Sequence, residues 1–543
     1  MAPRNPRTEL ATHDVTNQPP PLEDINLYTA DAILQSCCAW SGAARHDVRL
    51  SEFGERTGSQ EAREWGADAN RNAPQFQPFD RYGQRIDEIA FHPAYHNLMT
   101  MGLEAGVSGA AWTADAAGHA LHAALMVLMG QADYGVCCPM SMTYAAVPAL
   151  RSETALAARW IPLATMPAYD PRVVPWTEKR AVTIGMAMTE KQGGSDIRAN
   201  TTHAHPERDG TYRLVGHKWF CSAPMSDAFL TLAQAPGGLT CFLAPRWLDD
   251  GTRNPIEIQR LKDKLGDRSN ASSEIEYRDA SAWRVGDEGR GVRTIIEMVQ
   301  FTRFDCVVGS ATQMRHAAAL ALWHVQGRSA FQRRLIDQPL MRAVLADLAL
   351  DIEGAFALAF RLAMALDRGD DPHEAALARI GLPLAKYLVT KRAPAVIAEA
   401  MECLGGAGYV EEAPLARIFR QSPVNAIWEG SGNVIALDVI RALSRDPHCA
   451  AALVTELANA GLAARAGIDV PAILAQPISE REARHAVEQL AMALTAAVLV
   501  RFGQPAAADG FLVRRMAGRS LTLGAGSGTI DESALIERLA LSA

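Results

Sequence analysis

The stretch Met186-Ala187-Met188-Thr189-Glu190-Lys191-Gln192-Gly193-Gly194-Ser195-Asp196 places two hydroxyl side chains, two adjacent glycines and free backbone amides in one short turn after an apolar run. Glycine lets a backbone approach a flat or anionic ligand closely, and hydroxyls bond to its polar edge. Twenty residues on, Gly216-His217-Lys218-Trp219-Phe220-Cys221-Ser222 adds aromatic side chains beside another hydroxyl. We interpret the two segments as a cradle for a planar redox ring. A glycine-rich turn without a ligand explains the first segment alone equally well.

The composition is that of an ordinary soluble protein. The chain has 543 residues, 48 % of them hydrophobic and 21 % charged, which allows several domains and a sizeable core. The formal net charge of −8 argues against a globally basic nucleic-acid binder but leaves room for a local basic patch.

The nine cysteines form no Cys-x-x-Cys pair, and their number is odd. This pattern is typical of reduced, mostly buried thiols in the cytoplasm, and no zinc-ligand spacing is present, so we expect no metal. His92 and His96 are four residues apart, but Pro93 and Tyr95 between them favour packing over metal binding.

The sequence shows neither a signal peptide nor a membrane-spanning run. Residues 1–24 are polar, include Pro19-Pro20-Pro21 and lack the apolar core of a signal peptide, so we expect a disordered arm on the surface. The longest apolar run, 354–366, is interrupted by Arg361 and is too short to span a bilayer. We therefore expect a cytoplasmic protein with no membrane partner.

The pattern along the chain predicts an α+β protein in four parts after the arm. Residues 25–182 are mostly helical in character, and residues 183–290 form a small β-domain with a hairpin around Pro236-Gly237-Gly238. Residues 291–440 return to helix, and residues 441–543 form a further alanine-rich helical domain.

A carboxylate follows a tryptophan in Ile427-Trp428-Glu429-Gly430-Ser431-Gly432-Asn433. A carboxylate against apolar surface loses hydration, so its pKa rises and it becomes a better proton acceptor near neutral pH. On spacing alone, an exposed Glu that caps a helix is the better interpretation.

Two further segments carry weak signals. Leu404-Gly405-Gly406-Ala407-Gly408-Tyr409 ends a helix and exposes amide donors, as many helix ends do. Arg328 precedes Phe331, and a guanidinium holds phosphate well, although a surface salt bridge is the commoner role.

Taken together, the four segments resemble the acyl-CoA dehydrogenase superfamily over about residues 90–440. The resemblance implies an N-terminal helical domain, a middle β-barrel or sandwich domain and a C-terminal helical bundle around FAD. The chain is most similar to the AidB-like subfamily, bacterial flavoproteins of the adaptive response to DNA alkylation, and it shares with them an extra C-terminal helical domain. The segments that carry this likeness are 91–96, 138–143, 189–196, 260–272 and 428–433.

The resemblance assigns roles by position. Glu429 matches the catalytic base, which removes the α-proton of an acyl-CoA thioester while FAD takes a hydride from the β-carbon. Phe220, rather than Trp219, matches the usual ring-stacking tryptophan. Arg328 and the Gly405-Gly406 run match segments that contact FAD across a subunit interface, which implies a homotetramer. The full set of implied cofactor contacts is Met186, Met188, Thr189, Gly194, Ser195, Phe220, Ser222, Arg328, Gly405, Gly406, Ile427, Trp428, Gly430, Ser431 and Asn433.

The sequence departs from the superfamily pattern at three places. Lys191-Gln192 replaces a commoner proline-containing turn, as it does in the AidB-like subfamily. Phe331-Gln332 replaces the usual Phe-Gly, and Arg420-Gln421 replaces the usual Arg-Asp, so the adenine side of FAD is expected to be held differently. The AidB-like subfamily dehydrogenates poorly, and we accordingly expect a narrowed acyl pocket with weak activity toward an isovaleryl-CoA-like thioester.

The subfamily also implies binding of double-stranded DNA through the extra domain. From residue 441 onward there are ten arginines, no lysines and ten acidic residues, so this region is formally neutral. Arginine suits phosphate contacts, although arginines on helices more often form solvated salt bridges. The candidate DNA contacts are Arg481, Arg484, Arg514, Arg515 and Arg519.

Three functions therefore remain open on the sequence. One is an AidB-like flavoprotein that binds and protects DNA and has weak dehydrogenase activity. Another is a catabolic short- or branched-chain acyl-CoA dehydrogenase with an added domain. The third is a flavoprotein that detoxifies alkylating agents or uses FAD mainly to stabilise the tetramer.

Overall fold

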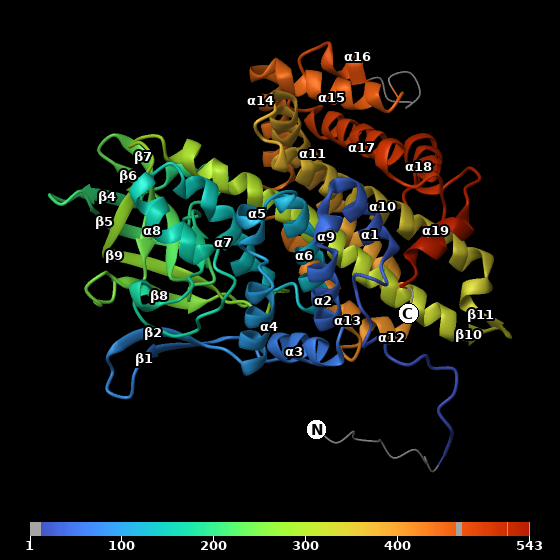
Figure 1. Ribbon diagram of the computed structural model, residues 1–543, viewed down its shortest axis with the longest axis horizontal. Helices are drawn as coiled ribbons and strands as arrows, with labels where there is room; N and C mark the ends of the chain where they lie inside the picture. Colours follow the sequence, from blue (N-terminus) through green and yellow to red (C-terminus); the bar gives the residue numbers. More distant parts are fainter. Residues whose placement is uncertain (1–11, 463–469, 519, 542–543) are drawn as a thin grey trace.

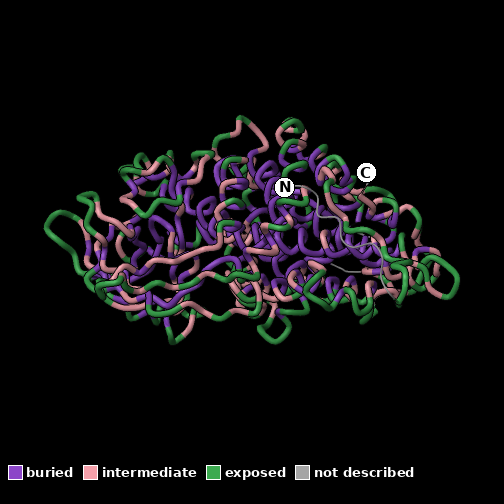
Figure 2. Tube along the Cα trace, turned by 90° about the horizontal axis from the view of Figure 1, so that it is seen from below, coloured by how far each residue is buried: buried purple, intermediate pink, exposed green. Residues whose placement is uncertain are grey.

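The computed structural model describes residues 12–462, 470–518 and 520–541. The β-domain occupies one end of the long axis, and helices fill the remainder, with the last helices forming a layer above the central bundle (Figure 1). Buried residues run continuously along the long axis, and the exposed segments are the loops around it (Figure 2). One apolar core therefore joins the helical parts, while a smaller cluster fills the β-domain.

The N-terminal part is helical, as expected, except for one hairpin. Its helices are α1 (Ala32–Ser41), α2 (Asp47–Thr57), α3 (Gln60–Arg71), α4 (Pro93–Glu104), α5 (Ala110–Thr113), α6 (Gly118–Ala132), α7 (Cys137–Leu150) and α8 (Thr154–Ala164). Helix α6 is buried on every side, and α7 packs beside it against α9.

The hairpin of β1 (Gln75–Phe79) and β2 (Arg85–Ala90) was not predicted from the sequence. It extends toward the β-domain, where the Arg85 guanidinium donates to the carbonyl of Ile258 at 2.6 Å. The strands are short and polar, so their pattern gives no strong signal, and this contact with the β-domain helps hold them in place.

The middle domain is a β-barrel with two additional strands. Its strands are β3 (Ile184–Ala187), β4 (His203–Pro206), β5 (Tyr212–Ser222), β6 (Ala228–Ala235), β7 (Gly238–Pro245), β8 (Ile256–Leu261) and β9 (Ser272–Val285). The order β6-β4-β5-β9-β7 closes on itself because β7 also pairs with β6, while β3 joins β6 and β8 joins β9. The predicted hairpin around Pro236-Gly237-Gly238 is confirmed as β6–β7.

The C-terminal bundle is built on three long helices, α9 (Gly291–Gly327), α10 (Pro339–Asp367) and α11 (Pro372–Cys403). Short elements follow: α12 (Gly406–Tyr409), α13 (Pro414–Gln421) and α14 (Gly432–Arg445). The two-residue strands β10 (Ser329–Ala330) and β11 (Arg333–Arg334) form a small hairpin after α9. Helix α9 packs against α6, α7, α10 and α11, so it forms the central axis of the fold.

The extra helices form a layer that covers α10 and α11. They are α15 (Pro447–Asn459), α16 (Val470–Leu474), α17 (Ala483–Phe502), α18 (Pro505–Phe511) and α19 (Glu532–Leu539), with a π-helical turn at Leu512–Ala517. Among the described helices, only α17 is long and apolar enough to cross a bilayer, with a mean hydropathy of 1.2. Two thirds of that stretch is buried against its neighbours, which is the pattern of a core helix. The predicted fold class, with its fourth helical part, is confirmed.

Candidate active site

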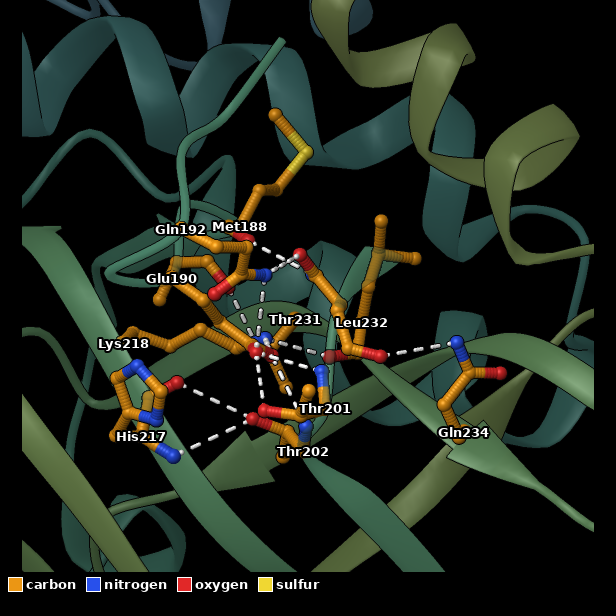
Figure 3. A network of polar contacts seen from close by, with 12 residues as sticks. Met188, Glu190, Gln192, Thr201, Thr202, His217, Lys218, Thr231, Leu232 and Gln234 are labelled. Carbon is orange, nitrogen blue, oxygen red and sulfur yellow. Dashed lines mark hydrogen bonds and ion pairs between the residues drawn. The ribbon is translucent and has the colours of Figure 1, made fainter. Parts of the chain in front are cut away.

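The turn after β3 is fixed by a buried ion pair (Figure 3). Glu190 Oε1 lies 2.9 Å from Lys218 Nζ, and both side chains are fully buried. Glu190 also accepts hydrogen bonds from the backbone N–H groups of Thr201, at 2.6 Å, and Thr202, at 3.1 Å. Lys218 donates a second bond to the carbonyl of Leu232 at 2.7 Å. Every charge in the pair is thus compensated, as a low-dielectric interior requires.

The pKa values of this pair follow from its surroundings. Burial alone would raise the pKa of Glu190, but the Lys218 ammonium and the Thr201 N–H lower it to about 2. Burial lowers the pKa of Lys218 to about 8, against the opposing effect of Glu190. Both groups are charged at neutral pH, so the pair holds the turn in one conformation.

This network positions the backbone of the predicted cradle. The Trp219 N–H donates to the carbonyl of Thr189 at 2.7 Å, which ties β5 to the turn. The Asn200 amide holds the carbonyl of Met188 at 3.0 Å. A Cβ on Gly194 would lie 2.5 Å from Thr189 Oγ1, so only glycine fits against that hydroxyl.

The predicted ring-facing residues lie together on this side of the barrel. Met186, Met188 and Thr189 are half-buried, while Gly194 and Ser195 are exposed. Phe220, the predicted stacking residue, is 50 % exposed, with the Lys262 ammonium 4.6 Å from its ring centre. Because this surface offers an exposed aromatic face beside open hydroxyls and amides, it fits a planar ring system with a polar edge.

The second site segment lies against α9. Glu429 is half-buried, and its φ of +58° is in the left-handed region that non-glycine residues rarely adopt. Thr302 Oγ1 donates to Glu429 Oε2 at 2.7 Å. The Arg303 side chain donates to the carbonyl of Glu429 at 3.0 Å, and Lys386 donates to the carbonyl of Gly430 at 2.8 Å. A strained backbone held by two side chains, with the carboxylate held by a third, is typical of a functional position.

Burial raises the pKa of the Glu429 carboxyl, while the Thr302 hydroxyl and the nearby Lys386 and Arg303 charges oppose that rise. The exposed, helix-capping interpretation of Glu429 is therefore wrong. Its side chain bonds to another helix, and Ser431, not Glu429, occupies the N-cap position of α14.

Cys138 connects the two halves of the site. Burial raises the pKa of its thiol to about 12, the charges of Asp267 and Glu429 raise it further, and the hydroxyl of Ser222 in β5 lowers it. Ser222 and Glu429 are thus close to the same side chain, although 207 residues separate them in sequence.

The other predicted site residues of this segment lie in the turn before α14 and in its first turn. Ile427 is 65 % exposed, and Trp428 donates its indole N–H to the Asn425 side chain at 3.0 Å. Asn433 Oδ1 accepts a bond from the Arg484 guanidinium at 3.2 Å. Arg484 belongs to α17, so the extra domain touches the catalytic segment directly.

Arg328 and the Gly405-Gly406 run lie elsewhere in the chain. Arg328 follows α9 and is 26 residues from Thr302, which is about 39 Å along a helix at 1.5 Å per residue. Gly405, with φ +60°, and Gly406 have open space where side chains would stand. Within one copy of the chain, Arg328 is therefore far from the Glu429 region, and its contact with FAD across a subunit interface stays a prediction.

The turn between β10 and β11 has an unusual conformation and exposure. Phe331 and Gln332 have φ values of +52° and +63°, the signs that a type I′ turn requires and that favour glycine or asparagine. Phe331 is 95 % exposed, so a strained turn presents a bare aromatic ring. Gln332, which replaces the usual glycine of the family, therefore has a backbone conformation that glycine would adopt without strain.

The arginines predicted to contact DNA do not form one exposed patch. Arg514 is buried and bonds to the carbonyl of Gly526. Arg515 forms ion pairs with Asp351, at 3.0 Å, and Asp347, at 3.4 Å, of α10, so its charge is neutralised within the protein. The expectation of an exposed cluster is wrong for these two, and Arg519 lies outside the described residues. Arg481 and Arg484 are exposed.

Several residues of the site were missed by sequence reasoning. Thr302, Arg303 and Lys386 come from helices far from Glu429 in sequence, and no local pattern marks them. Lys218 carried a usable signal, because it continues the alternation of the inward-facing Tyr212 and Leu214, and a lysine at such a position must find a buried partner.

Comparison with known proteins shows the family to which the chain belongs. Residues 17–171 match the model of the adaptive response protein AidB N-terminal domain, residues 185–280 match the acyl-CoA dehydrogenase middle domain, and residues 289–444 match the acyl-CoA dehydrogenase C-terminal domain. AidB of Escherichia coli (strain K12) is 48 % identical over 437 residues, covering 80 % of this chain and 81 % of that protein. The chain belongs to the AidB-like branch of the acyl-CoA dehydrogenase family.

Solved structures agree with this placement. The apo form of Bd2924 has a TM-score of 0.82 at 28 % identity, covering 90 % of this chain and 99 % of its own. Acyl-CoA dehydrogenase 11 of Caenorhabditis elegans, in complex with C11-CoA, also has a TM-score of 0.82, at 27 % identity, covering 94 % and 93 %. An FAD complex of an acyl-CoA dehydrogenase from Bacillus anthracis shares the fold, with a TM-score of 0.63 at 17 % identity over 77 % and 80 %.

Family membership makes the chain an FAD-dependent oxidoreductase of the acyl-CoA dehydrogenase type. The surface between Phe220, the Met188–Ser195 turn and Glu429 fits this cofactor, because it combines an aromatic face, free hydroxyls and a carboxylate.

Proposed function

We propose that the chain removes the α-proton of an acyl-CoA thioester with Glu429, in a weak dehydrogenation coupled to FAD, and that it binds and protects double-stranded DNA during alkylation stress. The observation that carries the first part is the carboxylate of Glu429, which is held by Thr302 in a strained backbone beside the cradle. We place this activity in the cytoplasm, in a homotetramer.

The protein's part in the reaction is to position groups and to move one proton. Bound FAD supplies the hydride acceptor for the β-carbon. Glu429 must be ionised to accept the α-proton, and its raised pKa brings its basicity closer to neutral pH. Arg303 and Lys386 fix the backbone carbonyls of Glu429 and Gly430, and the Thr302 hydroxyl holds the carboxylate itself.

Residues from both halves of the site would hold the cofactor. Phe220 would stack on the ring, while Thr189, Ser195 and Ser222 would bond its polar edge or its phosphates. Asn433 would contact it from the α14 side. Arg328 of a second copy would meet the cofactor's anionic part, which is the reason for proposing a tetramer.

The test of the catalytic part is Glu429→Gln. The variant should bind FAD normally and lose about 10²–10⁴-fold in the rate of flavin reduction by isovaleryl-CoA, because general-base help has that size. Glu412→Gln, at an exposed position, is the matched control. Flavin reduction at the unaltered rate by Glu429→Gln would overturn the assignment.

The DNA part is supported by the likeness to AidB and by two exposed cations on the extra domain. Arg481 is exposed, and the partners of Arg484 are the neutral Tyr387 and Asn433, so neither charge is neutralised by an ion pair among the described residues. These arginines can contact backbone phosphate, which should make binding fall steeply with salt.

A duplex-DNA titration across salt concentrations tests this part. Arg481→Ala combined with Arg484→Ala should weaken binding and reduce the salt slope, whereas Arg71→Ala, on an exposed arginine of α3, should not. An unchanged slope would remove this surface from the proposal. Absence of DNA binding together with fast acyl-CoA turnover would favour a catabolic dehydrogenase, and consumption of an alkylating agent without DNA would favour detoxification.

A further inference from the structure

The N-terminal arm is ordered against the end of α9 in the described part of the chain. Residues 12–24 run along the surface to α1, and Asn17 lies beside the β10–β11 hairpin. The Asn17 side chain donates to the carbonyl of Ser329 at 2.8 Å and accepts from the Ser329 N–H at 2.6 Å. The expectation of a disordered arm is therefore wrong for this stretch, while residues 1–11 lie outside the described residues.

The same short stretch holds Arg328 and the last turn of α9. The Asn17 carbonyl accepts a bond from Arg328 Nη1 at 3.0 Å, and the carbonyl of Pro20 accepts one from the Trp323 indole at 2.7 Å. A Cβ placed on Gly327 would lie only 2.7 Å from Pro19 Cβ, so the arm packs closely on that glycine. Three hydrogen bonds and one close packing contact thus fix three successive residues of the chain, Gly327, Arg328 and Ser329.

Asn17 is suited to this role by its backbone. Its φ of +57° is in the left-handed region, which asparagine tolerates better than most residues. That conformation lets the side chain bond to both polar groups of Ser329 while the carbonyl turns toward Arg328. The three bonds therefore depend on one residue in one conformation.

Arg328 keeps its charge available in this arrangement. Its guanidinium bonds to a neutral carbonyl, and among the described residues it forms no ion pair with a carboxylate. Its charge is felt by His324, whose pKa is lowered by burial and further by Arg328. A half-buried, oriented and uncompensated guanidinium is what an anionic ligand requires.

We propose that Asn17 is a positioning residue for FAD binding: the arm holds Arg328 and the β10–β11 hairpin of one subunit in the conformation that receives the cofactor's diphosphate from the neighbouring subunit. This inference rests on the proposed cross-subunit role of Arg328. Without the arm, Arg328 and the strained turn at Phe331-Gln332 would have to be ordered when the cofactor binds. Ordering one long side chain costs about a two- to tenfold loss of affinity.

The test compares Asn17→Ala with Val15→Ala, a control at an exposed position of the same arm. Asn17→Ala should raise the FAD dissociation constant about two- to tenfold, measured by flavin fluorescence on apoprotein, with the tetramer fraction in sedimentation unchanged. Gly327→Ala, which forces Pro19 away, should reproduce the effect by a different route. Val15→Ala should bind FAD like the parent.

A double-variant comparison shows whether Asn17 acts through Arg328. Arg328→Ala should weaken FAD binding, and adding Asn17→Ala should then weaken it no further. If Arg328→Ala has no effect, the proposed role of Arg328 fails and this inference fails with it. If Arg328→Ala weakens binding while Asn17→Ala and Gly327→Ala do not, only the role of the arm is overturned.

Discussion

Thr302 donates a hydrogen bond to Glu429 across 127 residues of sequence, with 2.7 Å between Thr302 Oγ1 and Glu429 Oε2. This bond favours the charged form of a carboxylate that burial pushes toward the neutral form. The pKa of the proposed base is therefore set by two opposing effects, and one of them can be removed by substitution.

Thr302→Val should raise the pKa of Glu429 further, because the hydroxyl that stabilises the carboxylate is lost while the burial remains. A base works when it is deprotonated, so the acid limb of the pH–rate profile should move to higher pH. At a pH below that limb the variant should be slower than the parent, and well above it the rates should converge. The measurement is flavin reduction by isovaleryl-CoA from pH 5 to pH 9.

Thr302→Ser keeps the hydroxyl and is the matched control, so its profile should stay close to that of the parent. A pH–rate profile for Thr302→Val that coincides with that of the parent would show that the acid limb does not reflect the ionisation of Glu429.

The ion pair of Glu190 and Lys218 should contribute to stability mainly through the cost of breaking it. Lys218→Met leaves a fully buried carboxylate unpaired, which destabilises a protein by about 3–5 kcal/mol. Glu190→Gln combined with Lys218→Met should be less destabilised than Lys218→Met alone, because the orphaned charge is removed. Urea unfolding followed by tryptophan fluorescence measures both, and a double variant as unstable as the single would contradict the pairing.

The pH dependence of the same pair has a definite sign. Glu190 has a folded-state pKa of about 2, below the ordinary value near 4.5, so the unfolded chain binds its proton first as pH falls. Its contribution is fully present above about pH 4.5 and is lost between there and about pH 2. Replacing Glu190 with Gln should flatten the acid limb of stability in that window.

Local patterns predicted the parts of the fold that depend on neighbours in sequence. The β6–β7 hairpin around Pro236-Gly237-Gly238 and the change from helix to strand near residue 183 are examples. The turn at residues 186–196 and the segment at residues 427–433 could be proposed as site candidates from sequence, because their glycines, hydroxyls and carboxylate have chemical meaning wherever they fold.

Contacts between distant segments could not be predicted in the same way. Nothing in the sequence around Thr302 indicates that it faces Glu429, and Arg515 looks like any surface arginine until α10 places Asp347 and Asp351 beside it. Charge pairing inside a fold depends on which helices pack together, and that is decided by apolar faces rather than by the charges themselves.

The cysteines should be slow to react in the folded protein. All nine are free, and every one except Cys138 is buried. Burial raises the pKa of the thiols, to about 12 for Cys221, Cys241 and Cys306 among others, so little thiolate exists at neutral pH. A thiol reagent should label native protein far more slowly than protein in urea, and rapid labelling of several cysteines at pH 7.5 would contradict this burial.

The extra domain should depend on one arginine. Arg361 of α10 is buried and bonds to Glu374 of α11 at 2.7 Å and to Glu456 of α15 at 2.9 Å. Glu456 is also held by Arg501 of α17 at 2.9 Å, so the cluster joins the central bundle to the added helices. Arg361→Leu would leave two carboxylates close together in the interior, with an expected loss of about 3–5 kcal/mol.

The pH dependence of that loss distinguishes a charge effect from a packing effect. Burial raises the pKa of Glu456, but the bonds and charge of Arg361 outweigh that effect and lower it. Without Arg361, the pKa of Glu456 should therefore rise. Protonation of these carboxylates as pH falls then removes their repulsion in the variant. The loss in free energy of unfolding relative to the parent should therefore be largest near pH 7 and shrink toward pH 5. Arg368→Ala, at a neighbouring arginine that is 60 % exposed and lies 3.9 Å from Glu374, should cost at most about 1 kcal/mol. Amide hydrogen exchange in α15 provides the local measurement, and a deficit that does not change with pH would mean that lost packing, not repulsion between the two carboxylates, accounts for the instability.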